Sequence, residues 1–225
     1  METYIVRMWL PDRPGALGQV ASRIGAVRGE IVGIDILERG AGRAIDELVV
    51  QVPDESLIEL LVHEVQQVDG VAVEEIRPVA DALHDPRLDA LEMAAILVGA
   101  GECEELVEAV VTHARRVIGA EWAAVVQLDD GEVIAEVGTP PSTPWLLAFL
   151  TGSQESNRIV GGGGGADDIV WSPMPSSGLA LVLGRDATAY RARERRQVAA
   201  IARIVDTRVR ELSRQRARAN HPCRG

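Results

Sequence analysis

Residues 3–28, with the sequence TYIVRMWLPDRPGALGQVASRIGAVR, decide the fold of the first part of the chain. Within residues 3–10 every second side chain belongs to one apolar set, namely Tyr4, Val6, Met8 and Leu10. This period of two predicts a strand with one buried face, which ends at Pro11. From Ala16 to about Arg28 the apolar residues recur at helical spacing instead. Residues 12–15 form the predicted turn between the strand and the helix.

The same two periods continue along the chain and complete a small domain. The predicted elements are a strand at 31–37, a strand at 43–52, a helix at 54–68 and a strand at 71–76. Gly40–Gly42 joins the middle strands as a hairpin, and Asp54 is the predicted N-cap of the second helix. Because crossover connections are right-handed, the βαββαβ order predicts a four-stranded antiparallel sheet with both helices on one face, the ferredoxin-like arrangement.

A second pattern begins after residues 78–87, which contain two prolines and which we predict to be a linker. The predicted elements are helices at 89–98 and 102–118, a hairpin of strands at 122–128 and 132–137, strands at 169–171 and 178–183, and a long helix at 188–210. The apolar stripe of that last helix consists of Val198, Ile201, Val205, Val209 and Leu212. We predict the glycine run 161–165 to be a flexible loop and residues 216–225 to be a disordered tail.

Length and composition agree with an α+β protein of two domains, at residues 1–77 and 88–215. The chain has 225 residues, of which 47% are hydrophobic and only 3% aromatic. Both domains can therefore bury a core, which must consist of aliphatic side chains. No signal peptide or apolar run long enough for a membrane span is visible, so we expect a soluble cytoplasmic protein without a membrane partner. Cys103 and Cys223 stand far apart, and we expect no disulfide between them.

The charge of the chain is unevenly distributed. The net charge is −11, but residues 185–225 contain twelve arginines against four acids, and the chain has no lysine. An acidic body lacks the continuous basic surface that nucleic acid requires, so we do not expect nucleic acid as the main partner. The arginine-rich final helix has two interpretations, an interaction surface for nucleic acid or an acidic partner, or a solvated helix packed on the second sheet. We favour the second interpretation.

The turn Asp12-Arg13-Pro14-Gly15-Ala16-Leu17 is the candidate binding site. Gly15 can adopt backbone angles that are closed to other residues, and the amides that follow it point outward at the start of a helix. A carboxylate fits there. Asp12 can cap free amides or hold an ammonium group. The alternative is a tight helix-start turn in which Asp12 is only a capping carboxylate.

With this turn in place, residues 3–77 resemble the ACT domain, a small ligand-binding module of many enzymes of amino-acid metabolism. Both the D-x-P-G-x-L turn and the βαββαβ order agree with that family. The resemblance implies an amino acid as the ligand and side-by-side pairing into a homodimer. The expected ligand-binding residues are Asp12, Pro14, Gly15, Ala16, Leu17 and Asp35. The sequence departs from the amino-acid-binding members at Trp9 and Ile31, where these usually carry polar side chains.

Residues 88–215 more loosely resemble a GAF domain, a sensor fold with a central antiparallel sheet and flanking helices. The residues that carry the resemblance are the stretch Glu121–Val126, the hairpin turn Asp129–Gly131, and Gly178–Leu183 followed by the helix at 195–202. The short, glycine-rich middle differs from the family in the region where its members build a ligand pocket. The resemblance implies a degenerate copy with a structural or dimerising role.

Neither part of the sequence shows the side chains of a known catalytic or metal site. No G-x-S-x-G elbow, HExxH, CxxC or phosphate-binding loop occurs, and the four histidines are scattered. We therefore expect no enzyme activity, no cofactor and no metal. The leading hypothesis is a regulatory protein that binds an amino acid or a similar carboxylate. The competing hypothesis is an adaptor whose domains have lost their ligands and which acts through dimerisation and a protein partner bound by the long helix.

Overall fold

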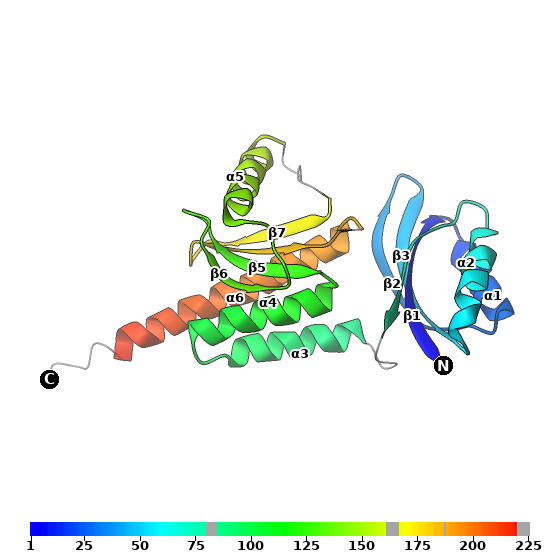
Figure 1. The fold of residues 1–225 in the computed structure, drawn as a ribbon, viewed down its shortest axis with the longest axis horizontal. Coiled ribbons are helices and arrows are strands. Elements are labelled where there is room, and N and C mark those ends of the chain that lie inside the picture. Colours follow the sequence, from blue (N-terminus) through cyan, green and yellow to red (C-terminus); the bar gives the residue numbers. More distant parts are fainter. Residues whose placement is uncertain (80–84, 161–166, 187, 220–225) are drawn as a thin grey trace. The chain divides into compact units, whose positions relative to one another are not determined.

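The computed structural model of the protein describes residues 1–79, 85–160, 167–186 and 188–219. The chain divides into two compact units (Figure 1). The first comprises Met1–Asp85 with the short segment Arg191–Arg193, and the second comprises Pro86–Tyr190 and Glu194–Gly225. Each unit has its own sheet and its own hydrophobic core.

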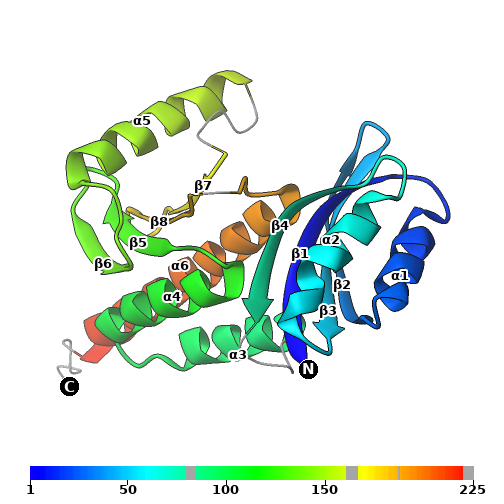
Figure 2. The same ribbon diagram turned by 45° about the vertical axis from the view of Figure 1, so that its right-hand side comes forward.

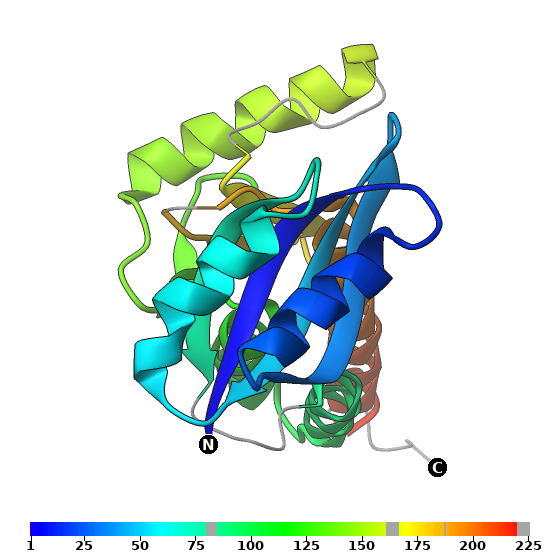
Figure 3. The same ribbon diagram turned by 90° about the vertical axis from the view of Figure 1, so that its right-hand side faces the viewer.

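The first unit has the predicted βαββαβ order. Its elements are β1 (Glu2–Pro11), α1 (Ala16–Ala26), β2 (Glu30–Gly40), β3 (Arg43–Val52), the short 3-10 helix η1 (Glu55–Leu57), α2 (Ile58–Gln66) and β4 (Ala72–Val79). The strands form an antiparallel sheet in the order β2-β3-β1-β4. Helices α1 and α2 lie together on one face of this sheet (Figure 3). The predicted ferredoxin-like arrangement is confirmed.

The alternation of β1 explains why the helices cover only one face of the sheet. The side chains that pack against the helices are the predicted apolar set Tyr4, Val6, Met8 and Leu10, all of them buried. Leu48 and Val50 of β3 lie opposite Val6 and Tyr4 and extend the same surface. From the helices, Val20 and Ile24 of α1 and Leu61 and Val65 of α2 complete the core. Asp54 caps η1 as predicted, because its side chain accepts a hydrogen bond from the Ser56 amide at 2.9 Å.

The second unit contains an antiparallel sheet with helices on both faces. Its elements are α3 (Pro86–Gly99), α4 (Cys103–Ile118), β5 (Trp122–Gln127), β6 (Val133–Val137), α5 (Thr143–Val160), β7 (Ile169–Met174), β8 (Leu179–Gly184) and α6 (Ala192–Ala219). The strand order is β6-β5-β8-β7. Helices α3, α4 and α6 cover one face and α5 covers the other (Figures 1 and 2). The α+β fold class, with a second antiparallel sheet flanked by helices, is confirmed.

Both faces of the second sheet are apolar, as strand β5 illustrates. Ala123 and Val125 pack with the side chains of α4 and α6, whereas Trp122, Ala124 and Val126 pack with Leu146 and Leu150 of α5. A strand with two buried faces needs a continuous apolar run, which the sequence Trp122–Val126 provides. The stripe predicted for the last helix is confirmed, since Val198, Ile201, Val205 and Leu212 are buried against this sheet and Val209 is partly buried.

Helix α5 is the main element that the sequence analysis missed, because proline and glycine frame its sequence. Pro144 occupies the first turn, where the missing N–H leaves no hydrogen bond unmade. The Trp145 and Leu146 amides both donate to the Ser142 carbonyl oxygen and so start the helix. Trp145 and Phe149, four residues apart, stack with ring centroids 5.3 Å apart. The helical spacing was therefore present in a segment for which no element was predicted.

The bounds of β4, α3 and α6 also differ from the predictions. Strand β4 continues to Val79 and helix α3 already begins at Pro86, so regular structure occupies both ends of the expected linker 78–87. Helix α6 begins at Ala192 and extends to Ala219, which makes residues 216–219 helical and not a disordered tail. The excess of arginine near the C-terminal end of α6 suits the negative end of the helix dipole and explains the longer helix. The glycine run 161–165 lies outside the described residues.

We predict that Gly184→Ala destabilises the second unit. A Cβ atom at Gly184 would lie 2.3 Å from two ring atoms of Trp122, and a buried indole ring cannot move aside without disturbing its neighbours. The expected loss is about 2 kcal/mol in the free energy of unfolding, measured by urea denaturation. Gly152→Ala is the matched control, since Gly152 has open space around it in helix α5 and should be neutral or slightly stabilised. Equal stability of the two variants would contradict this packing.

Candidate ligand site at the start of helix α1

The turn between β1 and α1 is fixed by backbone hydrogen bonds. The Asp12 amide donates to the carbonyl oxygen of Gly42 at 2.9 Å, which ties the turn to the hairpin between β2 and β3. The Arg13 amide donates to the carbonyl oxygen of Pro11 at 2.8 Å, and the Ala16 amide donates to the carbonyl oxygen of Arg13 at 3.3 Å. The chain thus leaves the sheet and enters helix α1 within four residues. The start of α1 has a defined position relative to the end of the sheet.

Gly15 occupies the N-cap position of α1 in a left-handed conformation, with φ 87° and ψ −11°. Such a positive φ is readily adopted by glycine alone, which explains the residue type at this position. Gly15 is exposed, and no heavy atom lies within 4 Å of the place where a Cβ atom would be. The backbone at the start of the helix is therefore accessible from solvent.

The first turn of α1 has no side-chain cap within the described part of the chain. The first amides of any α-helix have no partner inside the helix, and here no acidic residue of the first turn approaches them either. Asp12 does not cap these amides, because Gly15 is the N-cap residue and no side chain of the described residues accepts a capping hydrogen bond there. The positive end of α1 is consequently available to an anion from outside.

The predicted site residues of the turn contribute in different ways. Asp12, Pro14 and Gly15 are exposed, whereas the Ala16 side chain is buried and Leu17 packs against the core of the first unit. Ala16 therefore offers a ligand neither its side chain nor its amide, which already donates to the Arg13 carbonyl oxygen, whereas Leu17 can offer its backbone amide. Asp12 leaves its carboxylate in solvent beside the turn, where it can hold a cationic group.

Asp35 does not lie with the other predicted residues. It stands opposite Glu47 of β3, and Glu47 stands opposite Arg7 of β1. Residues that are directly opposite in an antiparallel pair point to the same face, and Arg7 alternates with the residues that contact the helices. Asp35 is thus on the sheet face away from α1, so the sheet separates it from the turn. The prediction that Asp35 belongs to the same binding site as the turn is therefore wrong, because the register of β2 puts it on the other face of the sheet.

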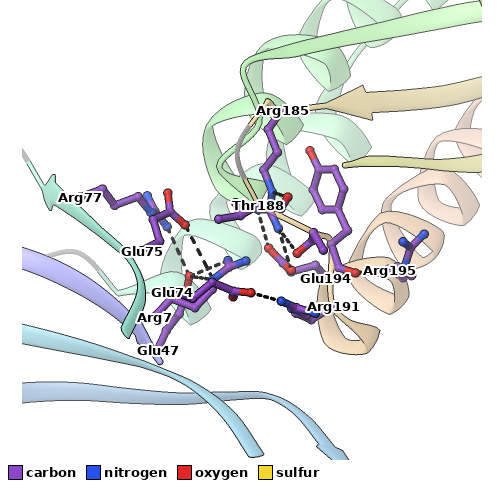
Figure 4. Close-up of polar contacts among 12 residues, drawn as sticks. Arg7, Glu47, Glu74, Glu75, Arg77, Arg185, Thr188, Arg191, Glu194 and Arg195 are labelled. Atoms are coloured by element: carbon purple, nitrogen blue, oxygen red, sulfur yellow. Dashed lines mark hydrogen bonds and ion pairs between the residues drawn. The ribbon is translucent and has the colours of Figure 1, made fainter. Parts of the chain in front are cut away.

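That second face of the sheet carries a charged cluster that the sequence analysis did not identify (Figure 4). Arg7 is 2% exposed and donates to Glu47 Oε1 from Nε at 3.0 Å and from Nη2 at 2.7 Å. Oε2 of Glu75 in β4 lies 3.9 Å from Nε of Arg7, and Nη2 of Arg77 lies 3.8 Å from Oε1 of Glu47. A buried guanidinium needs such partners. The only signal in the sequence was a charged residue, Arg7, between the apolar Ile5 and Trp9 on the face of β1 opposite the buried set.

We predict that Glu47→Gln destabilises the first unit by about 2 kcal/mol in the free energy of unfolding, because it leaves the buried Arg7 without its main counter-charge. Glu64→Gln is the matched control, since Glu64 pairs with Arg23 at 2.9 Å and Arg23 is half exposed. An exposed pair of this kind contributes less than about 1 kcal/mol. Chemical denaturation of both variants measures the difference, and equal losses would contradict a structural role of the Arg7 cluster.

Asp46 is a buried carboxylate on β3, on the same sheet face as the helices. It lies opposite Met8, and its Oδ1 atom has no hydrogen-bond partner among the described residues. Burial raises the pKa of Asp46 above its ordinary value; the nearby negative charge of Asp12 adds to this rise, and Arg39 opposes it. Ionised Asp46 is therefore an unfavourable element of the folded state.

We predict that Asp46→Asn raises the melting temperature at pH 7. An acid whose pKa is raised by folding opposes folding when it is ionised, and this penalty disappears as the pH falls and the group is protonated. The stability difference between the variant and the wild type should accordingly shrink from pH 7 towards pH 4. Calorimetry over this pH range gives the measurement. A variant that is less stable than the wild type at pH 7 would show that the charge of Asp46 is favourable.

Arg185, which lies between β8 and α6, has a structural role in the second unit. Arg185 is buried, and its side chain donates to Glu194 at 2.7 and 3.1 Å and to the carbonyl oxygens of Thr188 and Ala189 at 2.8 Å (Figure 4). Its guanidinium also lies 4.0 Å from the centre of the Tyr190 ring. These contacts fix the connection between β8 and α6. They show that Arg185 is packed within the second unit.

The remaining structural features concern metals, cysteines and membranes. Among the described residues no group of three or more His, Cys, Asp or Glu side chains is arranged to hold a metal ion. Cys103 is a free thiol, and Cys223 lies outside the described residues. No helix in the described ranges is long and apolar enough to cross a membrane.

Comparisons with known proteins found resemblances of fold only. No protein-family model and no curated protein matches the chain. The ACT domain of GTP pyrophosphokinase from Chlorobium tepidum is 18% identical, with 35% of this chain and 100% of that chain covered and a TM-score of 0.29. An ACT domain protein from Streptococcus pneumoniae is also 18% identical, with 37% and 98% covered and a TM-score of 0.30.

A longer match covers most of the chain. The photosensory core module of a Stigmatella aurantiaca phytochrome is 15% identical, with 83% of this chain and 45% of that chain covered and a TM-score of 0.40. This chain thus spans less than half of the phytochrome module. These identities and TM-scores show a likeness of fold and carry no argument about function.

Proposed function

We propose that the protein is a non-enzymatic regulator whose first unit binds a small carboxylate, with an amino acid as the expected ligand, at the start of helix α1. The observation that carries this proposal is the uncapped, exposed N-terminus of α1 behind the left-handed Gly15. The ACT-like turn and strand order agree with it. The bound carboxylate would accept hydrogen bonds from the amides of Leu17 and Gly18, which lie in the first turn.

The chemistry of the turn suits a zwitterion better than a simple anion. A helix N-terminus stabilises a negative charge by about 0.3–1 kcal/mol at an exposed site, which alone gives little affinity. Asp12 supplies a second, opposite charge beside the turn, and it is exposed and does not cap the helix. A ligand with a carboxylate and a nearby ammonium group uses both features. An α-amino acid has this arrangement whatever its side chain is.

We predict that at least one proteinogenic amino acid stabilises the protein against heat. A ligand at about 100 times its dissociation constant stabilises the folded state by about 2.7 kcal/mol, which corresponds to a rise in melting temperature of about 5 °C or more for a chain of this size. A thermal-shift screen of the amino acids, with acetate and methylamine as single-charge controls, measures this effect. No shift with any amino acid at millimolar concentration would refute the proposal and favour the adaptor hypothesis.

A substitution at Gly18 tests whether the ligand binds at the turn. Gly18 lies in the first turn of α1, is exposed and has open space where a Cβ atom would be. In Gly18→Glu the new carboxylate can reach back to the free amides, which suits the helix but excludes a ligand carboxylate. Gly18→Gln has the same size without the charge. We expect the thermal shift to be lost in Gly18→Glu and largely kept in Gly18→Gln.

Gly15→Val is a poorer test of the same site. The positive φ of Gly15 strains any residue with a Cβ atom, so a lost ligand response could reflect a distorted turn. Gly18 has ordinary helical geometry and avoids this ambiguity. An equal ligand response in the wild type and Gly18→Glu would show that the ligand binds elsewhere.

A further inference from the structure

A groove of about 360 Å³ lies between helices α3 and α6 of the second unit. Its lining residues are Val98 of α3 and, from α6, Arg203, Ile204, Thr207, Arg208 and Glu211. The five residues of α6 are one, three, one and three positions apart, so they share one face of the helix. The volume is within the range of pockets that hold small molecules. The groove therefore has the size of a small-molecule site.

The apolar part of the groove consists of Val98 and Ile204. Val98 is 58% exposed, and Ile204 is partly buried against the core of the second unit. Arg208 fixes the distance between the two helices, since its Nε and Nη2 donate to the Ala100 carbonyl oxygen at 3.1 and 2.7 Å. Ala100 follows directly after α3 and is buried. The two aliphatic side chains are therefore held in place as a preformed surface for the apolar part of a ligand.

The polar side chains of the lining largely satisfy one another. Nη1 of Arg208 lies 3.1 Å from Oε2 of Glu211, so these two charges neutralise each other. The Thr207 hydroxyl donates to the carbonyl oxygen of Arg203 at 2.9 Å and is thus used within the helix. What remains is the charge of the Arg203 guanidinium. The groove therefore carries one net positive charge.

Arg203 is exposed and has no acidic partner in the part of the chain that the structure describes. Salt bridges along a helix join residues three or four positions apart, and of the residues at those distances from Arg203 only Asp206 is acidic. Asp206 is already occupied, because its two carboxylate oxygens accept hydrogen bonds from the amide and the hydroxyl of Ser176, each at 2.9 Å. The Arg203 guanidinium is therefore available to an anion from outside, which it can bind through two parallel hydrogen bonds.

We propose that this groove binds a small amphiphilic anion, namely a carboxylate on a short aliphatic chain. Arg203 pairs with the carboxylate, and the chain lies on Val98 and Ile204. The positive charge selects against an amine, and the two aliphatic side chains select against a small inorganic anion, which has no apolar part to bury. The site belongs to the second unit alone, so it does not depend on the proposed ligand site at the start of α1.

Methyl correlation spectra of the full-length protein, recorded during titration with hexanoate, test this site. We expect the methyl signals of Val98 and Ile204 to shift and to saturate at millimolar concentration, because the chain of the ligand lies against them. Hexylammonium has the same chain with the opposite charge, and acetate has the charge without the chain. Both should bind at least about tenfold more weakly than hexanoate. Equal binding of either probe, or unshifted methyl signals with hexanoate, would overturn the proposal.

Arg203→Gln tests the role of the charge. We expect it to weaken hexanoate binding by about tenfold, because it removes the cation that pairs with the carboxylate. Arg210→Gln is the matched control, since Arg210 is an exposed arginine of the same helix that does not line the groove. Both variants lose one positive charge, so a loss of affinity confined to Arg203→Gln identifies a direct contact and not a general effect of net charge. Equal affinities of the two variants would contradict the pairing.

The amide signals of the first unit distinguish this groove from the proposed site at the start of α1. Shifts of the Leu17 and Gly18 amides with hexanoate, while the methyl signals of Val98 and Ile204 stay unchanged, would overturn the groove and support the site in the first unit. Shifts at Val98 and Ile204 that are lost in Arg203→Gln would establish the groove, whatever happens at the turn. Failure at one site therefore leaves the other untouched.

Discussion

The left-handed backbone of Gly15 is the constraint on which the candidate site depends. With φ 87° at this residue, the chain turns from the end of β1 into α1 without a side chain over the first helical amides. Any other residue would adopt this conformation under strain and would place a Cβ atom where the backbone is now exposed. The buried Ala16 and the partly buried Leu17 then anchor the helix to the sheet, so the amides stand at a fixed place. Preorganised donors bind an anion without having to be ordered first.

The two sheets differ in how many of their faces are apolar and covered by helices. In the first unit, helices cover the face that carries Val6 and Leu48, and the other face carries the charged cluster of Arg7 and Glu47. In the second unit, helices cover both faces of the sheet. Helix α5 fills one of them with Leu146 and Leu150, which leaves this side packed with aliphatic and aromatic side chains.

Periodicity in the sequence was sufficient to predict most of the fold. The alternation in β1 predicted its buried face, and the stripe of α6 predicted its packing on the second sheet. The face of Asp35 was not predictable, because β2 has irregularities between Ile31 and Gly33 and between Ile36 and Glu38 that interrupt the alternation of its side chains. The Arg7 cluster depends on contacts between residues about forty positions apart, and no local pattern encodes such contacts. The turn could be predicted because its backbone conformation at position 15 favours glycine.

The most direct measurement of the central claim is a nitrogen–proton correlation spectrum of the labelled protein during titration with the amino acids. Binding of a carboxylate at the start of α1 predicts the largest shifts for the amides of Leu17 and Gly18, because these donors would meet the ligand, with smaller shifts at Gly15 and Asp12. Saturation of these shifts would define the affinity. Unchanged turn amides, or large shifts confined to residues of the second unit, would contradict the account.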